Sequence, residues 1–108
     1  MPRAILVVNS QPSSPARQGE FEDWYDNTHI PQVLTTPGFI GGRRFRLHDG
    51  GGDPGTACAQ LVIYDLDADD PMDAVAELQR RALAGDLVSS DAIASDPAPT
   101  PLLYVQQN

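Results

Sequence analysis

The sequence predicts an α+β domain in which two helices cover one face of a four-stranded antiparallel sheet. Three observations lead to this prediction. Four short segments are rich in strand-forming apolar residues, and two longer segments carry apolar residues at helical spacing. The segments follow one another as strand, helix, strand, strand, helix, strand. A Gly-rich stretch between the two middle strands is typical of a hairpin connection.

The boundaries of the elements follow from local signals. We expect strands at residues 3–9, 39–48, 56–65 and 102–106, and helices at about 20–34 and 70–84. This βαββαβ order is the split βαβ, or ferredoxin-like, arrangement. The chain shows no internal repeat and no domain boundary, so residues 1–108 are interpreted as a single domain.

The second helix has the clearest end signals. Asp70 suits the N-cap, Pro71 the first helical position and Gly85 the stop. Its predicted apolar stripe consists of Met72, Val75, Ala76, Gln79, Ala82 and Leu83.

The second strand carries three of the seven arginines. Alternation predicts one face with Phe39, Arg43, Phe45 and Leu47, and another with Ile40, Arg44, Arg46 and His48. The Gly41–Gly42 pair is typical of a bulge or a close backbone approach. An anionic ligand near these arginines and ordinary solvated strand arginines are both compatible with the pattern.

The first and third strands are apolar on both faces, although helices cover only one. A second copy of the chain is the simplest cover for the other face. We therefore expect a homodimer that forms through the sheet.

Composition excludes several classes of function. The net charge is −8 and the chain contains no Lys, which disfavours binding to nucleic acid or anionic membranes and excludes a Lys Schiff base. The sequence has no apolar run long enough to span a membrane and no recognisable signal peptide, so a cytoplasmic protein is expected. Two His and one Cys make a zinc or other metal site improbable, and we predict none.

The first helix carries the candidate functional residues. Phe21, Trp24, Tyr25, Thr28 and Gln32 recur at helical spacing and form an aromatic stripe with His29 at its edge. Pro31 predicts that the helix kinks or ends close to His29, where the helix dipole would raise the imidazole pKa. Such a stripe is also typical of a plain core, with His29 as a hydrogen-bonded packing residue.

The run Glu20–Pro31, with Pro37-Gly38-Phe39 and Arg43-Arg44-Phe45, resembles the EthD-like branch of the dimeric α+β barrel superfamily. There a W-Y-x-x-x-H-[IL]-P helix precedes a P-G-F turn and an R-R-[YF] strand, and the match covers about a third of the chain. The resemblance implies a ferredoxin-like protomer, a dimer through the sheets and a small-molecule pocket between the first helix and the sheet. The matching residues are Trp24, Tyr25, Asn27, His29, Arg43 and Arg44.

From these residues we predict a cofactor-independent lyase or isomerase, similar to a cyclase, acting on a polyketide-like, aromatic or lactone substrate by proton transfer α to a carbonyl. His29 is the candidate acid or base, and Tyr25 the candidate donor to an enolate oxygen. The candidate substrate-binding residues are Phe21, Trp24, Asn27, Thr28, Arg43, Arg44 and Phe45. Three alternatives stay open: a cofactor-free monooxygenase, a haem protein with His29 as axial ligand, and a non-catalytic ligand-binding accessory protein.

Overall fold

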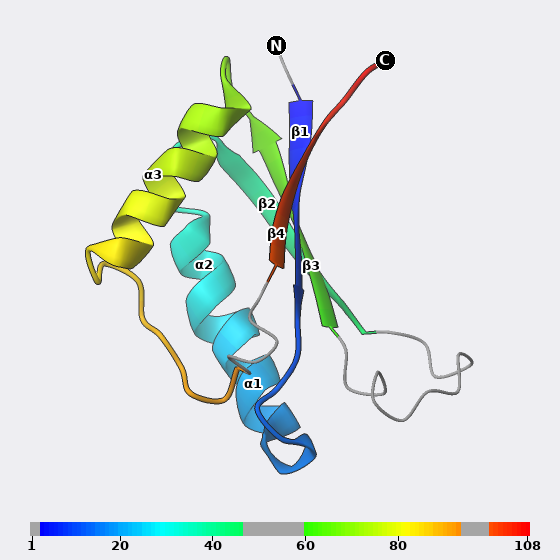
Figure 1. The fold of residues 1–108 in the computed structure, drawn as a ribbon, viewed down its shortest axis with the longest axis vertical. Coiled ribbons are helices and arrows are strands. Elements are labelled where there is room, and N and C mark those ends of the chain that lie inside the picture. The colour runs from blue at the N-terminus through cyan, green and yellow to red at the C-terminus, as the bar shows by residue number, and fades with distance from the viewer. Residues whose placement is uncertain (1–2, 47–59, 94–99) are drawn as a thin grey trace.

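The computed structural model describes residues 3–46, 60–93 and 100–108, and it has the predicted ferredoxin-like architecture (Figure 1). Its strands are β1 (Arg3–Ser10), β2 (Phe39–Arg46), β3 (Gln60–Asp67) and β4 (Thr100–Val105). The first helical unit consists of α1 (Gln18–Trp24), a π-helical turn η2 (Tyr25–His29) and α2 (Ile30–Val33), preceded by the short 3-10 turn η1 (Pro15–Arg17). The second helix is α3 (Pro71–Leu83). We call residues 18–33 the first helix.

The four strands form one antiparallel sheet in the order β2-β3-β1-β4. Both helices lie on the same side of it (Figure 1). We call this side the inner face and the opposite side the outer face. Strands β1 and β3 are central, which agrees with their apolar composition.

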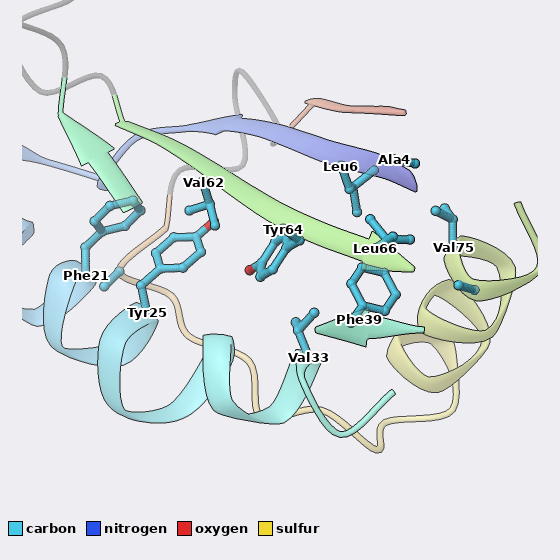
Figure 2. Close-up of a cluster of buried hydrophobic side chains, with 12 residues drawn as sticks. Ala4, Leu6, Phe21, Tyr25, Val33, Phe39, Val62, Tyr64, Leu66 and Val75 are labelled. Carbon is cyan, nitrogen blue, oxygen red and sulfur yellow. The ribbon is translucent and has the colours of Figure 1, made fainter. Parts of the chain in front are cut away.

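The core lies between the inner face and the helices. Strand β3 contributes Val62, Tyr64 and Leu66, and the first helix contributes Phe21 and Tyr25, all at most 2% exposed. In Figure 2, Phe21 and Tyr25 rise from the first helix towards the sheet, and Tyr64 points from β3 towards Tyr25. Burial of these large side chains is the main source of stability.

The first helix passes through Pro31 and ends at Val33, so it does not end near His29, and the irregularity expected there is the π turn Tyr25–His29. A proline cannot donate to the carbonyl four residues earlier, and its ring crowds that carbonyl. The chain widens into a π turn instead, in which the amide of Ile30 donates to the carbonyl of Tyr25 five residues back.

Strand β2 contains the bulge that the Gly41–Gly42 pair indicated. Its register with β3 shifts between Phe39 and Gly41, so that the pairing skips Ile40. The face assignment of β2 is therefore corrected. Phe39 shares the inner face with Arg44, whereas Arg43 lies on the outer face.

The ends of α3 are as predicted. The Asp70 carboxylate accepts a hydrogen bond from the amide of Met72, and Gly85 adopts a φ of 79° just beyond the helix. The predicted apolar stripe is largely wrong, since Met72 is 59% exposed and Leu83 91% exposed. The buried residues are Pro71, Ala74 and Val75.

Residues 86–93 form an irregular segment. The Gly-rich tip, Cys58 and His48 lie outside the described residues. No helix in the described ranges combines the length and apolar character needed to cross a membrane.

Gly42 provides a test of the contact between the first helix and the sheet. A Cβ atom at this position would lie 2.9 Å from Ile30 Cγ2 and 3.2 Å from Tyr64 Cδ1. We expect Gly42→Ala to lower the free energy of unfolding by about 1–3 kcal/mol, because overpacking forces both neighbours to shift. Urea denaturation measures this change.

Gly19→Ala is the matched control, because a Cβ there meets no atom within 4 Å. It should stabilise the protein by roughly 0.5 kcal/mol through helix propensity. Equal effects of the two substitutions would contradict the close contact at Gly42.

Candidate functional site

The π turn brings the aromatic rings of the first helix together with His29. The His29 ring stacks on Trp24, with centroids 4.5 Å apart and planes 20° apart, and it meets the edge of Tyr25 at 5.3 Å. Trp24 and His29 are five residues apart, a spacing that faces away in a regular α-helix. The widened turn therefore creates this stack.

His29 is neutral at physiological pH. Burial lowers its pKa from 6.5 to about 4, because a charged imidazole would lose its hydration. The expected rise of the pKa at a helix end is wrong, since the helix continues beyond His29 and desolvation dominates. The His29 Nδ1 atom is buried and has no hydrogen-bond partner.

Tyr25 points from the first helix to the inner face of the sheet. Its hydroxyl group lies 3.0 Å from the Ser10 hydroxyl of β1, and desolvation raises the pKa of the phenol. Tyr25 is therefore a neutral phenol that one hydrogen bond fixes in place.

Two residues that were not predicted complete the polar part of this region. Tyr64 and Gln60 lie on the inner face of β3 and are each 2% exposed. The Tyr64 hydroxyl and the Gln60 Nε2 atom are buried without partners. Burial raises the pKa of the Tyr64 phenol, so it too stays protonated.

A sequence signal for these two residues existed. Gln60 and Tyr64 alternate with Val62 and Leu66 along one face of a central strand, where polar groups are unusual unless they are hydrogen-bonded.

Arg44 and Arg46 both face the first helix, and Arg46 donates to Glu22 Oε2 at 2.7 Å. Arg44 is the one that also contacts Gln60. The guanidinium group of Arg44 forms a bidentate pair with Asp26 at 3.0 Å. It also lies 3.6 Å from Glu22 and donates to Gln60 Oε1 at 3.0 Å.

Arg43 lies on the outer face beside Asp65 and over the ring of Phe45. Arg43 and Phe45 are thus separated from His29 by the sheet.

The remaining predicted residues divide between core and surface. Phe21 is fully buried and contacts the ring of Tyr25 edge-on at 5.0 Å. Asn27 is exposed and donates to Asp23 on the solvent side of the helix. Thr28 is half-buried.

Of the predicted site residues, the structure therefore brings Trp24, Tyr25 and His29 together, with Arg44 nearby. Asn27 lies on the solvent side of the helix.

Residues 86–93 cover the outside of the first helix, and we call them the cover segment. The indole nitrogen of Trp24 donates to the Val88 carbonyl at 3.2 Å, and the Val88 amide donates to Gln32 Oε1 at 2.8 Å. Farther along, Arg17 pairs with Asp91 at 2.6 Å. The cover segment thereby fixes the Trp24 ring that supports His29.

Two cavities are lined by described residues that do not include His29. One of about 320 Å³ lies at the end of the sheet and includes Arg3, Asp65 and Tyr104 in its lining. The other, of about 530 Å³, lies beside the start of α3. Within the described ranges, no group of three or more His, Cys, Asp or Glu side chains is placed to hold a metal ion.

Comparison with solved structures confirms the fold. A dimeric ferredoxin-like protein from an uncultured marine organism superposes with a TM-score of 0.61 at 11% identity, over 98% of this chain and 96% of that one. An EthD family protein from Bacillus halodurans gives a TM-score of 0.51 at 19% identity, over 99% and 100%. The resemblance to the EthD-like family is thus confirmed at the level of the fold.

A third neighbour carries a ligand. It is the ActVA-Orf6 monooxygenase of Streptomyces coelicolor in complex with Nanaomycin D, with a TM-score of 0.51 at 13% identity over 97% of this chain and 88% of that one. No protein-family model and no curated protein matches the sequence.

The depressed pKa of His29 predicts a pH-dependent stability. Below pH 6.5 the unfolded chain binds a proton that the native imidazole does not bind until about pH 4, so stability falls as the pH drops through this window. Between pH 7.5 and pH 5.0 we expect His29 to account for a loss of about 2 kcal/mol.

Urea unfolding of the wild type and His29→Gln at both pH values measures this contribution as a difference between the two pH-dependent losses. The smaller loss should belong to the variant. An equal loss in both proteins would show that His29 is not held neutral by burial.

Proposed function

We propose that this protein is a small-molecule enzyme whose site is the seam between the first helix and the inner face of the sheet. The observation that carries the proposal is a set of three buried polar atoms without partners: His29 Nδ1, Tyr64 OH and Gln60 Nε2. All three belong to side chains of the first helix or of the inner face of β3. The fold that the chain shares with a ligand-bound monooxygenase supports a small-molecule function.

A buried polar group without a hydrogen bond costs about 1–3 kcal/mol, and native proteins retain few of them. Ligand oxygen atoms would accept hydrogen bonds from the Tyr64 hydroxyl and from Gln60 Nε2, while Trp24 and Tyr25 provide aromatic surface for a ring system. We therefore infer an aromatic or polycyclic ligand that carries at least one carbonyl group.

Proton transfer is the chemistry that these residues support. A neutral His29 can accept a proton from the carbon α to the carbonyl, and the enolate charge that develops beside it would raise its pKa. Tyr25 and Tyr64 remain protonated and can donate to the enolate oxygen. This favours a lyase or isomerase that needs no cofactor.

Access to the seam requires movement, because the three unpartnered atoms are all buried. The cover segment contacts Trp24 and Gln32 through the backbone of Val88. A shift of this segment or of the first helix would open the seam to a ligand.

A cofactor-free monooxygenase is the second candidate, and the ligand-bound neighbour favours it. The same seam and the Trp24 ring would then bind a phenol. Consumption of dioxygen in the presence of 1-naphthol, followed with an oxygen electrode, separates this activity from proton transfer, which proceeds without oxygen.

A haem protein with His29 as axial ligand is tested directly by adding haem to the purified protein, where a Soret band would identify it.

We further propose that the protein is a homodimer. The outer face exposes apolar side chains, among them Tyr104 at 54% and Leu102 at 44% exposure, next to the half-buried Ile5, Val7 and Ile63. Such a face on a sheet is typical of an interface. One structural neighbour is a dimeric protein of the same fold.

The dimer proposal predicts that Leu102→Asp dissociates the protein, because a carboxylate in an apolar interface loses its hydration. Sedimentation velocity at micromolar concentration should show a dimer for the wild type and a monomer for the variant. Leu83→Asp, the same change on the exposed surface of α3, should leave the dimer intact. A monomeric wild type would refute the proposal.

The proton-transfer proposal predicts exchange of an acidic α-proton. We expect the wild type to accelerate deuterium incorporation into 2-tetralone in D2O without oxygen, as followed by proton NMR. His29→Gln should slow this exchange by about a hundredfold or more, which is the usual contribution of a general base.

Tyr64→Phe should also slow the exchange, whereas Tyr104→Phe, the same change on the outer face, should not. An exchange rate that is indifferent to His29→Gln would exclude His29 as the base.

A further inference from the structure

We propose that Gln60 is the specificity-determining residue of this site, and that its side-chain amide donates a hydrogen bond to the carbonyl or enolate oxygen of the ligand. The inference rests on the proposed function, which it deepens by defining the ligand group that the seam selects. It is carried by the contacts of Gln60 and does not depend on which residue moves the proton.

The orientation of the Gln60 amide follows from its neighbour Arg44. The guanidinium Nη1 atom lies 3.0 Å from the Gln60 amide and carries only donor hydrogens. The carboxamide oxygen must therefore face Arg44, which leaves the Nε2 group facing away from it. The two N–H bonds of this nitrogen are donors, and neither has a partner.

Arg44 is itself held in place. Its Nε and Nη2 atoms donate to the two carboxylate oxygens of Asp26, each at 3.0 Å. Glu22 lies 3.6 Å away on the same helix. A bidentate pair fixes the plane of a guanidinium group, so the direction of the Gln60 amide is fixed as well.

Asp26 belongs to the π turn that also contains His29. The same turn therefore positions the candidate base and, through Arg44, the amide of Gln60. The cross-strand partner of Gln60 is Ser10, whose hydroxyl binds Tyr25. Gln60 therefore lies next to two residues of the sheet, Arg44 and Ser10, that contact the first helix at Asp26 and Tyr25.

An inward-facing donor selects for an acceptor. A ketone, lactone or enolate oxygen would complete the hydrogen bonding of Nε2, whereas a hydrocarbon of the same shape would leave it unpaired. We therefore expect the site to prefer 2-tetralone to tetralin, which has the same two rings without the oxygen.

The test measures binding of both compounds by ligand-observed NMR titration. The wild type should bind 2-tetralone at least about fivefold more tightly than tetralin, the ratio expected for one hydrogen bond. Gln60→Leu should abolish this preference and retain affinity for tetralin. Gln79→Leu, the same change at an exposed position on α3, should behave like the wild type.

Two further variants keep the test decisive if Gln60→Leu does not fold. Gln60→Glu keeps the contact with Arg44 but replaces the donor with an acceptor, so it should bind 2-tetralone less tightly than tetralin. Arg44→Met should weaken 2-tetralone binding in the wild-type background but not in combination with Gln60→Glu, because the amide that it positions is then missing.

The outcomes distinguish the two proposals. An unchanged preference for 2-tetralone in either Gln60 variant would overturn the role of Gln60 and leave the proposed function standing. Failure of the wild type to bind either compound would overturn the proposed function, and the role of Gln60 with it.

Discussion

Pro31 has no amide hydrogen, and in a regular helix its ring would crowd the Asn27 carbonyl. The chain resolves this conflict without ending the helix. The turn from Tyr25 to His29 widens, and the amide of Ile30 donates five residues back. The arrangement of the site depends on this local constraint, because the widened turn stacks His29 on Trp24 and presents Asp26 to Arg44 on the sheet.

The seam between helix and sheet combines apolar packing with polar groups that are only partly satisfied. Tyr25 and Ser10 satisfy each other, and Arg44 is neutralised by carboxylates of the helix. Tyr64 and the nitrogen of Gln60 have no such partners. A core selected for stability alone would carry apolar residues at these two positions, since leaving buried donors unpaired is costly. The cost is understandable if a ligand completes the hydrogen bonds.

Local sequence signals predicted the order of the elements and the ends of α3, because Asp70, Pro71 and Gly85 act through their own backbone positions. Features that depend on tertiary packing could not be predicted from local sequence signals. The bulge at Ile40 puts Arg44 and Arg46 on the same face of β2 as Phe39, towards the first helix. For His29, burial had more effect on the pKa than the helix dipole. The two buried polar residues of β3, Gln60 and Tyr64, were not predicted because the apolar residues beside them indicated an ordinary central strand.

The most direct measurement is a crystal structure of the wild type soaked with 2-tetralone. We expect the ketone between the first helix and β3, with its oxygen about 3 Å from Gln60 Nε2 and its ring against Trp24 or Tyr25. A ketone found only in the cavity between Arg3 and Tyr104 at the end of the sheet, with the seam closed and Gln60 unpaired, would contradict it.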